Sequence, residues 1–163
     1  MPVLSDSTPA EALGNAGTFL REAGAPAVKV EGGVRTARVI DALVRAGIPV
    51  MGHIGLTPQS INGVGKVRVQ GKTRDTARAL IADALAVQEA GAFSMVLELV
   101  PEQLAAAITE RLAVPTIGIG AGAGCRGQIQ IIPDLIGLGD FIPKPAPPYV
   151  RIRALIREVG CPG

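Results

Sequence analysis

The sequence predicts an α/β fold in which about five parallel strands are covered by helices. Short apolar segments that are typical of strands alternate with amphipathic segments that are typical of helices. This order indicates a parallel sheet with helices over both faces. A complete (β/α)8 barrel usually needs at least about 200 residues. The 163 residues of this chain therefore predict either an open α/β sheet or part of a barrel.

The first helix has a recognisable start and stop in the sequence. Thr8 is suited to cap it, Pro9 suits the first helical position, and Glu11 completes a capping box. Gly24 ends the helix, because glycine readily takes the left-handed conformation that closes a helix. The segments expected to follow are a strand at 27–31, a helix at 34–46, a strand at 50–55 and a long loop at 56–72.

The second half of the chain repeats the strand and helix pattern. Thr73 begins a helix that stops at Gly91, and residues 93–100 form a nearly continuous apolar strand. The remaining segments are a helix at 101–112, a strand at 116–120, a Gly-rich turn at 121–124, a strand at 127–132, a Pro-rich loop at 143–148 and a helix at 150–159. No internal boundary stands out. We therefore expect a single domain over residues 1–163, in which 143–163 is a divergent loop and terminal helix.

Composition and charge exclude several classes of protein. The net charge is +2, and the Lys and Arg residues are scattered, without the basic stripe that is typical of nucleic-acid binding. The apolar runs are short and interrupted by charges, so we expect no membrane-spanning helix and no signal peptide. Cys125 and Cys161 fit neither a metal knuckle nor a redox pair and are expected to be free thiols. We therefore expect a cytoplasmic protein without a membrane or nucleic-acid partner.

Polar residues inside the expected strands are the main functional signal. A parallel strand that is buried on both faces is normally apolar. Lys29 and Glu31 nevertheless interrupt the first strand near its end, two residues apart and therefore on one face. His53 lies late in the second strand and Glu98 late in the third. Sites of parallel α/β folds form at the C-terminal ends of strands, so we expect these four side chains to converge.

The same residues also allow simpler interpretations, which stay open at this point. Lys29 and Glu31 can form an edge pair that faces solvent, and His53 can be a hydrogen-bonded core residue. Glu98 is more informative, because apolar residues flank it and a buried carboxylate is costly without a purpose. As site residues, Lys29 suits a substrate carboxylate, Glu31 suits a divalent cation such as Mg²⁺, and Glu98 suits a general base.

Other motifs predict little chemistry. The sequence has no cluster of Cys or His for zinc and no convincing Ser-His-Asp pattern. Residues 118–122 are rich in Gly but lack both a Walker motif and the GxGxxG spacing. We interpret this segment as a close-packed turn at the end of a strand.

A series of short strings carries a family resemblance. The most specific string is GHIGLTPQS at residues 52–60. The others lie at 28–33, 69–71, 84–85, 89–92, 96–98, 115–122 and 127–128. They follow one another over roughly residues 8–145, and so many ordered matches are not expected by chance. In these strings the chain resembles the ketopantoate hydroxymethyltransferase family.

The resemblance implies a fold, a reaction and roles for residues. That family is a TIM-type (β/α)8 barrel that forms oligomers and depends on Mg²⁺. It transfers a hydroxymethyl group from 5,10-methylenetetrahydrofolate to 3-methyl-2-oxobutanoate, which gives 2-dehydropantoate for pantothenate biosynthesis. By this resemblance we expect a homo-oligomer in which Lys29 and His53 bind the substrate. Glu31 would belong to the metal site, and Glu98 would be the proton acceptor.

The chain also departs from the family pattern. The family's first strands carry a Gly-Asp-Ser motif and a second Asp, whose carboxylates ligate the metal, and this sequence contains neither segment. We therefore expect an N-terminally truncated member that forms part of the barrel. Three functional readings stay open: an active transferase, a catalytically impaired subunit that binds an oxo acid or has a structural role, and a half-enzyme completed in trans by another chain.

Overall fold

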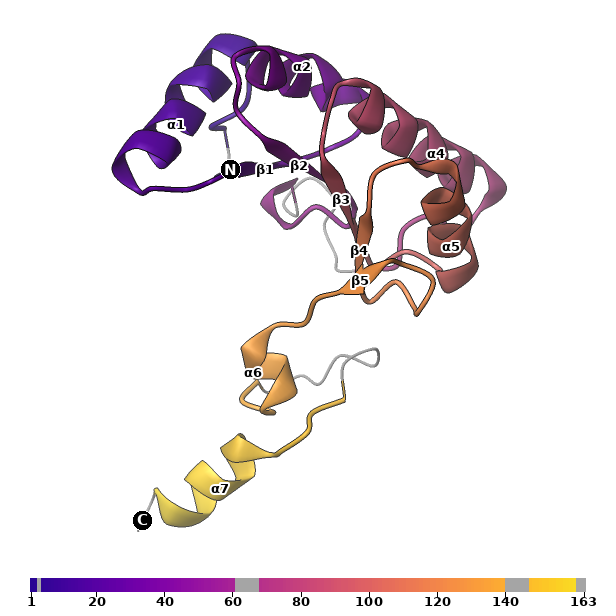
Figure 1. The fold of residues 1–163 in the computed structure, drawn as a ribbon. Coiled ribbons are helices and arrows are strands. Elements are labelled where there is room, and N and C mark those ends of the chain that lie inside the picture. Colours follow the sequence, from indigo (N-terminus) through magenta and orange to yellow (C-terminus); the bar gives the residue numbers. More distant parts are fainter. Residues whose placement is uncertain (3, 61–67, 140–146, 161–163) are drawn as a thin grey trace. The chain divides into compact units, whose positions relative to one another are not determined.

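The computed structural model describes residues 1–2, 4–60, 68–139 and 147–160, and its main feature is a single sheet (Figure 1). All neighbouring strands pair in parallel. The strands are β1 (Val28–Glu31), β2 (Val50–Gly55), β3 (Ser94–Glu98), β4 (Thr116–Ile119) and β5 (Gly127–Gln128). The prediction of about five parallel strands is confirmed.

The strand order distinguishes between the two folds that the chain length allows. The sheet runs β1-β2-β3-β4-β5, so each strand pairs with the next one along the chain. A doubly wound sheet reverses its order at a switch point, whereas successive strands of a (β/α)8 barrel lie side by side. The sheet is therefore part of a TIM-type barrel.

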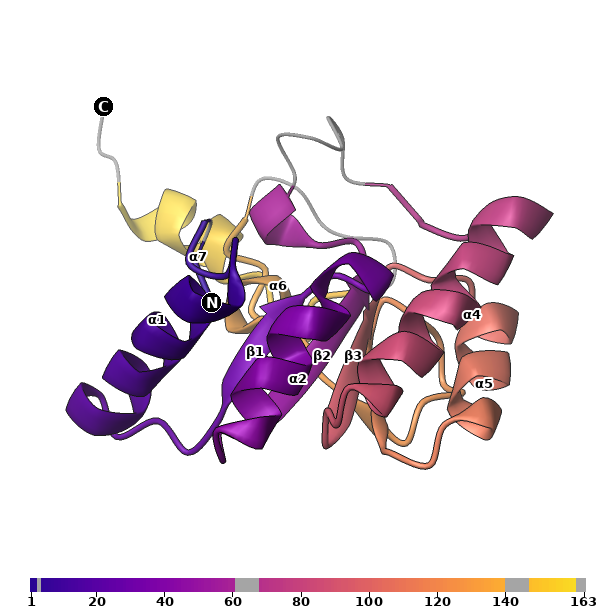
Figure 2. The same cartoon turned by 90° about the horizontal axis from the view of Figure 1, so that it is seen from above.

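The helices of this part of the chain lie along one face of the sheet (Figures 1 and 2). They are α1 (Pro9–Glu22), α2 (Ala37–Arg45), α4 (Arg74–Glu89) and α5 (Glu102–Arg111), with short 3-10 turns η1 (Val34–Thr36) and η2 (Pro58–Ser60). The expectation of helices over both faces is wrong for the described part of β1–β5. The reason is the barrel geometry, in which helices form an outer ring and the other face of the sheet turns inward. In the described segments, no helix has the length and apolar character needed to cross a bilayer.

Two helices begin after a threonine cap, as the sequence predicts. The capping box expected from Thr8 and Glu11 is only half formed, because Glu11 Oε2 accepts from the Thr8 hydroxyl at 3.1 Å and not from the Thr8 N–H. Thr8 Oγ1 accepts a hydrogen bond from the Glu11 backbone N–H at 3.3 Å, and α1 begins at Pro9. Thr73 Oγ1 accepts from the Thr76 N–H, while Thr76 Oγ1 accepts from the Thr73 N–H, and α4 follows. These bonds satisfy backbone donors that have no partner inside the first helical turn.

The chain after β4 differs from the prediction. β5 ends at Gln128, and a helix, α6 (Ile132–Leu135), lies at the end of the segment where the strand was expected to continue. Pro133 stands in the first turn of α6, where its fixed φ and missing N–H suit a helix but not a paired strand. Most of the Pro-rich loop at 143–148 lies outside the described residues, and the terminal helix is present as α7 (Ile152–Val159).

Contacts group the chain into two compact units, Met1–Gln128 and Ile129–Gly163. The first contains the sheet and the helices that cover it. In the second, the Tyr149 N–H donates to the Leu135 carbonyl at 2.8 Å, and the Ile152 N–H donates to the Ile136 carbonyl at 3.0 Å. These bonds connect α6 with the segment that leads into α7. The single domain over residues 1–163 stays a prediction.

A close approach between β2 and α4 sets the spacing of the main core. Val87 of α4 is fully buried against the sheet. A Cβ atom added at Gly52 would lie 2.3 Å from Val87 Cγ1, far inside van der Waals contact. Gly52 therefore lets α4 lie directly on β2, at the residue before His53.

Replacement of Gly52 by Ala is expected to destabilise the protein by about 1–3 kcal/mol, because the added methyl overpacks a tight core. Gly14→Ala is the matched control with the opposite sign. Gly14 is exposed in α1, and nothing lies within 4 Å of its added Cβ. Alanine there should stabilise the helix by about 0.5–1 kcal/mol. Urea unfolding of both variants tests the packing, and a neutral Gly52→Ala would contradict it.

Candidate active site

The four polar residues predicted from the strands lie on one face of the sheet. The register pairs Glu31 with His53 across β1 and β2, and Gly55 with Glu98 across β2 and β3. Neighbouring residues alternate in direction, so Val30, Ile54 and Leu97 enter the helix-covered core instead. The side chains of Lys29, Glu31, His53 and Glu98 therefore point to the opposite face, near the C-terminal ends of three adjacent strands.

His53 is the centre of this cluster, and its side chain is only 2% exposed. Its Nδ1 lies 2.8 Å from Lys29 Nζ and 3.3 Å from Glu31 Oε1. On the other side of the ring, Nε2 lies 3.1 Å from Glu98 Oε2. The structure thus brings all four residues together, with the imidazole between the two carboxylates.

The contact between His53 and Glu98 is close but poorly aligned. Although Nε2 and Oε2 are within hydrogen-bond distance, the ring N–H does not point along the line to the carboxylate, and Nε2 has no aligned acceptor among the described residues. We therefore describe this pair as a charge contact. It leaves the buried Nε2 available to a further acceptor.

Glu31 is held by donors on both of its oxygens. Lys29 Nζ donates to Oε1 at 3.3 Å, and the Gln59 backbone N–H in η2 donates to Oε2 at 2.9 Å. Burial alone would raise the pKa of Glu31, but the contact with His53, the hydrogen bond from the Gln59 N–H and the positive charge of Lys29 outweigh it and lower the pKa to about 2. Glu31 is therefore a carboxylate at neutral pH, and it is not part of a pair that faces solvent.

Opposing influences act on the protonation of His53. Burial lowers its pKa, because the charged imidazolium is poorly solvated, while the close contacts with the carboxylates of Glu31 and Glu98 raise it. The effect of the two carboxylates is larger than the effect of burial, so the pKa of His53 is raised. The positive charge of Lys29 acts against this rise.

The described residues do not by themselves fit a metal ion. No group of three or more His, Cys, Asp or Glu side chains in this part of the chain is arranged to hold one. Glu31 offers oxygen, the donor that Mg²⁺ prefers, but both of its oxygens already accept hydrogen bonds, one of them from the Lys29 ammonium. The role of Glu31 at a metal stays a prediction.

Two contacts that hold the site were not recognised in the sequence. The Gln59 N–H reaches Glu31 through the backbone, which no side-chain pattern reveals. Asp83 of α4 accepts from the Val34 N–H at 2.8 Å and so fixes the turn after β1. A Cβ atom at Gly33 would lie 1.9 Å from Asp83 Cγ, so glycine is required for this contact. The Gly pair at 32–33 is the signal in the sequence from which such a close approach could have been predicted.

The chain leaves β3 through an unusual backbone conformation directly after Glu98. Leu99 has a φ of 47°, in the left-handed region that costs a non-glycine residue about 1–3 kcal/mol. Its N–H donates to the Ile119 carbonyl at 2.9 Å, and its carbonyl accepts from the Gln70 N–H at 2.7 Å. These bonds hold the turn and with it the position of Glu98.

A cavity of about 240 Å³ borders the site on the Glu31 side. Residues of β1, η1, η2 and the N-terminal segment line it, among them Glu31, Arg35, Thr36 and Gln59. A cavity of about 370 Å³ lies within the second unit and contains none of the four clustered residues. The smaller cavity is therefore the one relevant to the site.

The lowered pKa of Glu31 predicts a dependence of stability on pH. The unfolded chain takes up a proton at Glu31 near pH 4.5, whereas the folded protein does so only near pH 2. The stabilisation from Glu31 is thus complete above about pH 4.5 and is lost as the pH falls toward about 2. We expect Glu31→Gln to be less stable than the wild type by roughly 1–3 kcal/mol at neutral pH. Denaturant unfolding should show this difference shrinking in acid, and a constant difference would contradict the assignment. Glu110→Gln, at an exposed position of α5, is the control.

The chain is similar in sequence to proteins of known name. A protein of Chloroflexus aurantiacus is 58% identical over 159 residues, which are 97% of this chain and 56% of that protein. One from Dehalococcoides mccartyi is 54% identical over 93% of this chain and 54% of its own length. One from Clostridium botulinum is 50% identical over 97% and 58%. All three are named 3-methyl-2-oxobutanoate hydroxymethyltransferase, and the chain spans a little more than half of their length.

The comparisons support both the fold and the family. A solved structure from Burkholderia cenocepacia, described as a phosphonomutase, matches with a TM-score of 0.52 and 20% identity over 69% of this chain and 50% of that one. At this identity the likeness concerns the fold alone. The family model described as ketopantoate hydroxymethyltransferase matches residues 1–160. The chain therefore belongs to the ketopantoate hydroxymethyltransferase family.

Proposed function

We propose that this protein transfers a hydroxymethyl group from 5,10-methylenetetrahydrofolate to 3-methyl-2-oxobutanoate and so forms 2-dehydropantoate. Membership of the family supports the reaction class. The observation that carries the proposal is the cluster of Lys29, Glu31, His53 and Glu98 at the ends of three adjacent strands. It combines a cation, a buried imidazole and a partly accessible carboxylate in one place.

The reaction needs a base, because the C3 proton of the oxo acid must leave before a carbon–carbon bond can form. We assign this step to Glu98, whose side chain is 17% exposed and so can be reached by a ligand. The C3–H bond breaks, the proton goes to Glu98, and the electron pair enters the enolate. Water adds to the methylene carbon of the folate, both of its C–N bonds break, and tetrahydrofolate leaves with formaldehyde released in the site. The enolate C3 then bonds to the carbon of formaldehyde, whose C=O electron pair moves to oxygen, and this oxygen takes up a proton to become the hydroxyl.

Lys29 and His53 are the residues that we propose for substrate binding. The Lys29 side chain is 40% exposed, so its ammonium can meet the carboxylate of the oxo acid while it contacts Glu31. His53 lies between Lys29 and Glu98, and its buried Nε2 is the donor nearest to the base. A substrate whose carboxylate lies at Lys29 would place its oxo group near this ring.

The family resemblance also implies Mg²⁺, and we propose Glu31 as a residue of the metal's surroundings. Its carboxylate would require further oxygen ligands beside it, since the described residues do not form a ligand set. None of the steps above passes through a metal. They rest on the charges and hydrogen bonds of the four clustered side chains.

We further propose a homo-oligomer in the cytoplasm whose ligands are the oxo acid and the folate. In the described part of the chain, β1 and β5 each pair with a strand on one side only. Such edges favour association with another chain. Cys125 is a free thiol, which agrees with a reducing compartment.

Exchange of the C3 proton of 3-methyl-2-oxobutanoate for deuterium tests the base directly. We expect the purified protein in D₂O with Mg²⁺ to catalyse this exchange. The loss of the C3–H signal in proton NMR measures its rate. Glu98→Gln should slow it by about 10²–10⁴-fold, the usual contribution of a general base. Glu110→Gln, exposed on α5, should exchange at the wild-type rate. Addition of 5,10-methylenetetrahydrofolate should then give 2-dehydropantoate.

Other outcomes would support the alternative readings. Binding of the oxo acid without exchange, in a sample with native unfolding behaviour, would indicate a subunit that has lost catalysis. Exchange that appears only after addition of a second chain would indicate a half-enzyme completed in trans. Equal exchange by the wild type and Glu98→Gln would remove Glu98 from its proposed role.

A further inference from the structure

The shortest contact among the four clustered side chains joins two nitrogen atoms. Lys29 Nζ lies 2.8 Å from His53 Nδ1. A lysine ammonium has three donors and no acceptor, so a ring nitrogen at this distance has to accept the hydrogen bond. Glu31 Oε1 lies 3.3 Å from both nitrogens and balances the charge of the ammonium. Lys29 therefore occupies the side of the ring that faces β1.

This contact determines where the imidazole carries its proton. A neutral ring has one N–H, so acceptance at Nδ1 leaves the proton on Nε2. We infer that Lys29 fixes His53 as the Nε2–H tautomer and so makes His53 a hydrogen-bond donor toward the reacting side of the site, next to Glu98. Lys29 then acts through His53 as a positioning residue, in addition to any contact with substrate.

The surroundings of the ring would favour a different state without Lys29. Glu31 and Glu98 lie on opposite sides of the ring, at 3.3 Å from Nδ1 and 3.1 Å from Nε2. With the ammonium removed, Nδ1 would face only the Glu31 carboxylate and would take up a proton to donate to it. The tautomer thus depends on one side chain, which makes the inference open to direct measurement.

The Nε2–H has a use that rests on the proposed function. It is buried and has no aligned acceptor in the described part of the protein. When Glu98 removes the C3 proton, negative charge develops on the 2-oxo oxygen of the substrate. A fixed donor beside the base would stabilise that oxygen and would be more effective in a buried site than in water. A ring protonated at Nδ1 alone would instead present a lone pair to the enolate.

The chain contains a single histidine, so ¹⁵N labelling of histidine gives the two ring nitrogens of His53 without overlap. Because the pKa of His53 is raised, long-range ¹H–¹⁵N spectra are recorded with rising pH until the ring is neutral. We expect the neutral ring to show a pyridine-type Nδ1 and a pyrrole-type Nε2. A protonated Nδ1 in the neutral ring would overturn the inference. This spectrum of the wild type is decisive even if a variant fails to fold.

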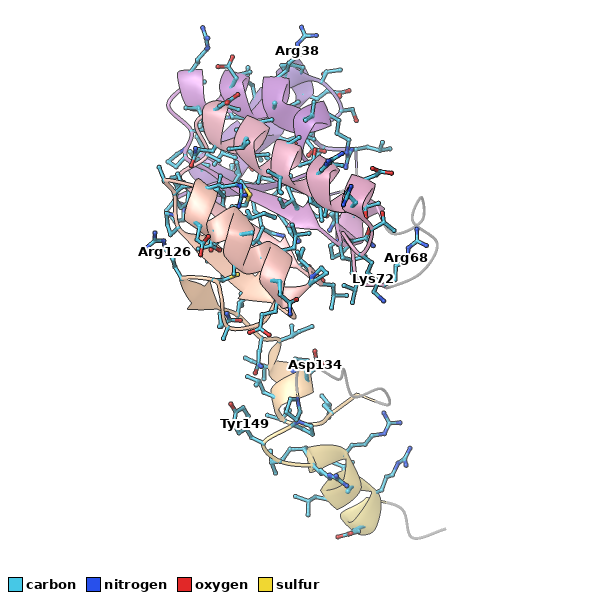
Figure 3. All side chains as sticks on the ribbon, turned by 90° about the vertical axis from the view of Figure 1, so that its right-hand side faces the viewer. Arg38, Arg68, Lys72, Arg126, Asp134 and Tyr149 are labelled. Carbon is cyan, nitrogen blue, oxygen red and sulfur yellow. The ribbon has the colours of Figure 1, made fainter. Side chains whose placement is uncertain are left out.

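Lys29→Met removes the ammonium but keeps most of the side-chain volume. In this variant, the ¹⁵N chemical shift of His53 Nδ1 should change from the pyridine type to the pyrrole type. Lys72→Met is the matched control, because Lys72 is exposed and lies before α4, outside the cluster (Figure 3). Its spectrum should equal that of the wild type. An unchanged Nδ1 in folded Lys29→Met would show that Lys29 does not set the tautomer.

The spectrum needs no turnover, so the tautomer and the proposed function can fail separately. A fixed Nε2–H in a protein that never exchanges the C3 proton would refute the proposed reaction and keep the assignment of the proton. Exchange of the C3 proton by a protein whose His53 carries its proton on Nδ1 would support the proposed reaction and refute the assignment of the tautomer. Addition of 3-methyl-2-oxobutanoate should shift the Nε2 resonance most, and an unperturbed Nε2 at saturation would exclude the proposed role of its proton.

Discussion

Two polar side chains that are both removed from water constrain the rest of the site. Glu31 and His53 are buried at neighbouring positions of β1 and β2, and each would be costly in that place without a partner. They lie 3.3 Å apart, and the ammonium of Lys29 contacts both of them. Because the parallel register sets them opposite each other, a slip of one residue would send these groups into the helix-covered core. The chemistry and the pairing of the strands therefore depend on each other.

The sequence predicts the site better than it predicts the local fold. Lys29, Glu31, His53 and Glu98 could be identified because a charge is conspicuous in a strand that should be apolar, and because strand ends meet at one edge. Parallel pairing of sequential strands then brought them together. The residue types suggested a chemical role for Lys29, Glu31 and Glu98, and the family strings implied the reaction and the substrates.

The features that were missed have physical reasons of their own. The Gln59 N–H belongs to the backbone, and every residue except proline has such a donor, so composition could not single it out. Asp83 lies 49 positions from its partner Val34, beyond the range of any local pattern. The coverage of the sheet by helices on one face follows from curvature, which apolar periodicity does not encode. β5 was expected to be longer because residues 129–132, three of which are Ile, suit a strand and a helix equally well.

The sequential order of the strands has a consequence for how the molecule is made. β1 pairs with β2, β2 with β3 and so on to β5, so each of these described strands pairs with the strand that precedes or follows it in the sequence. During synthesis each new strand would meet a finished edge as it leaves the ribosome, together with the helix that precedes it. Nascent chains that stop after β3 would already carry all four clustered side chains and the segment that supports Glu31. Assembly of the cluster would then precede completion of the sheet.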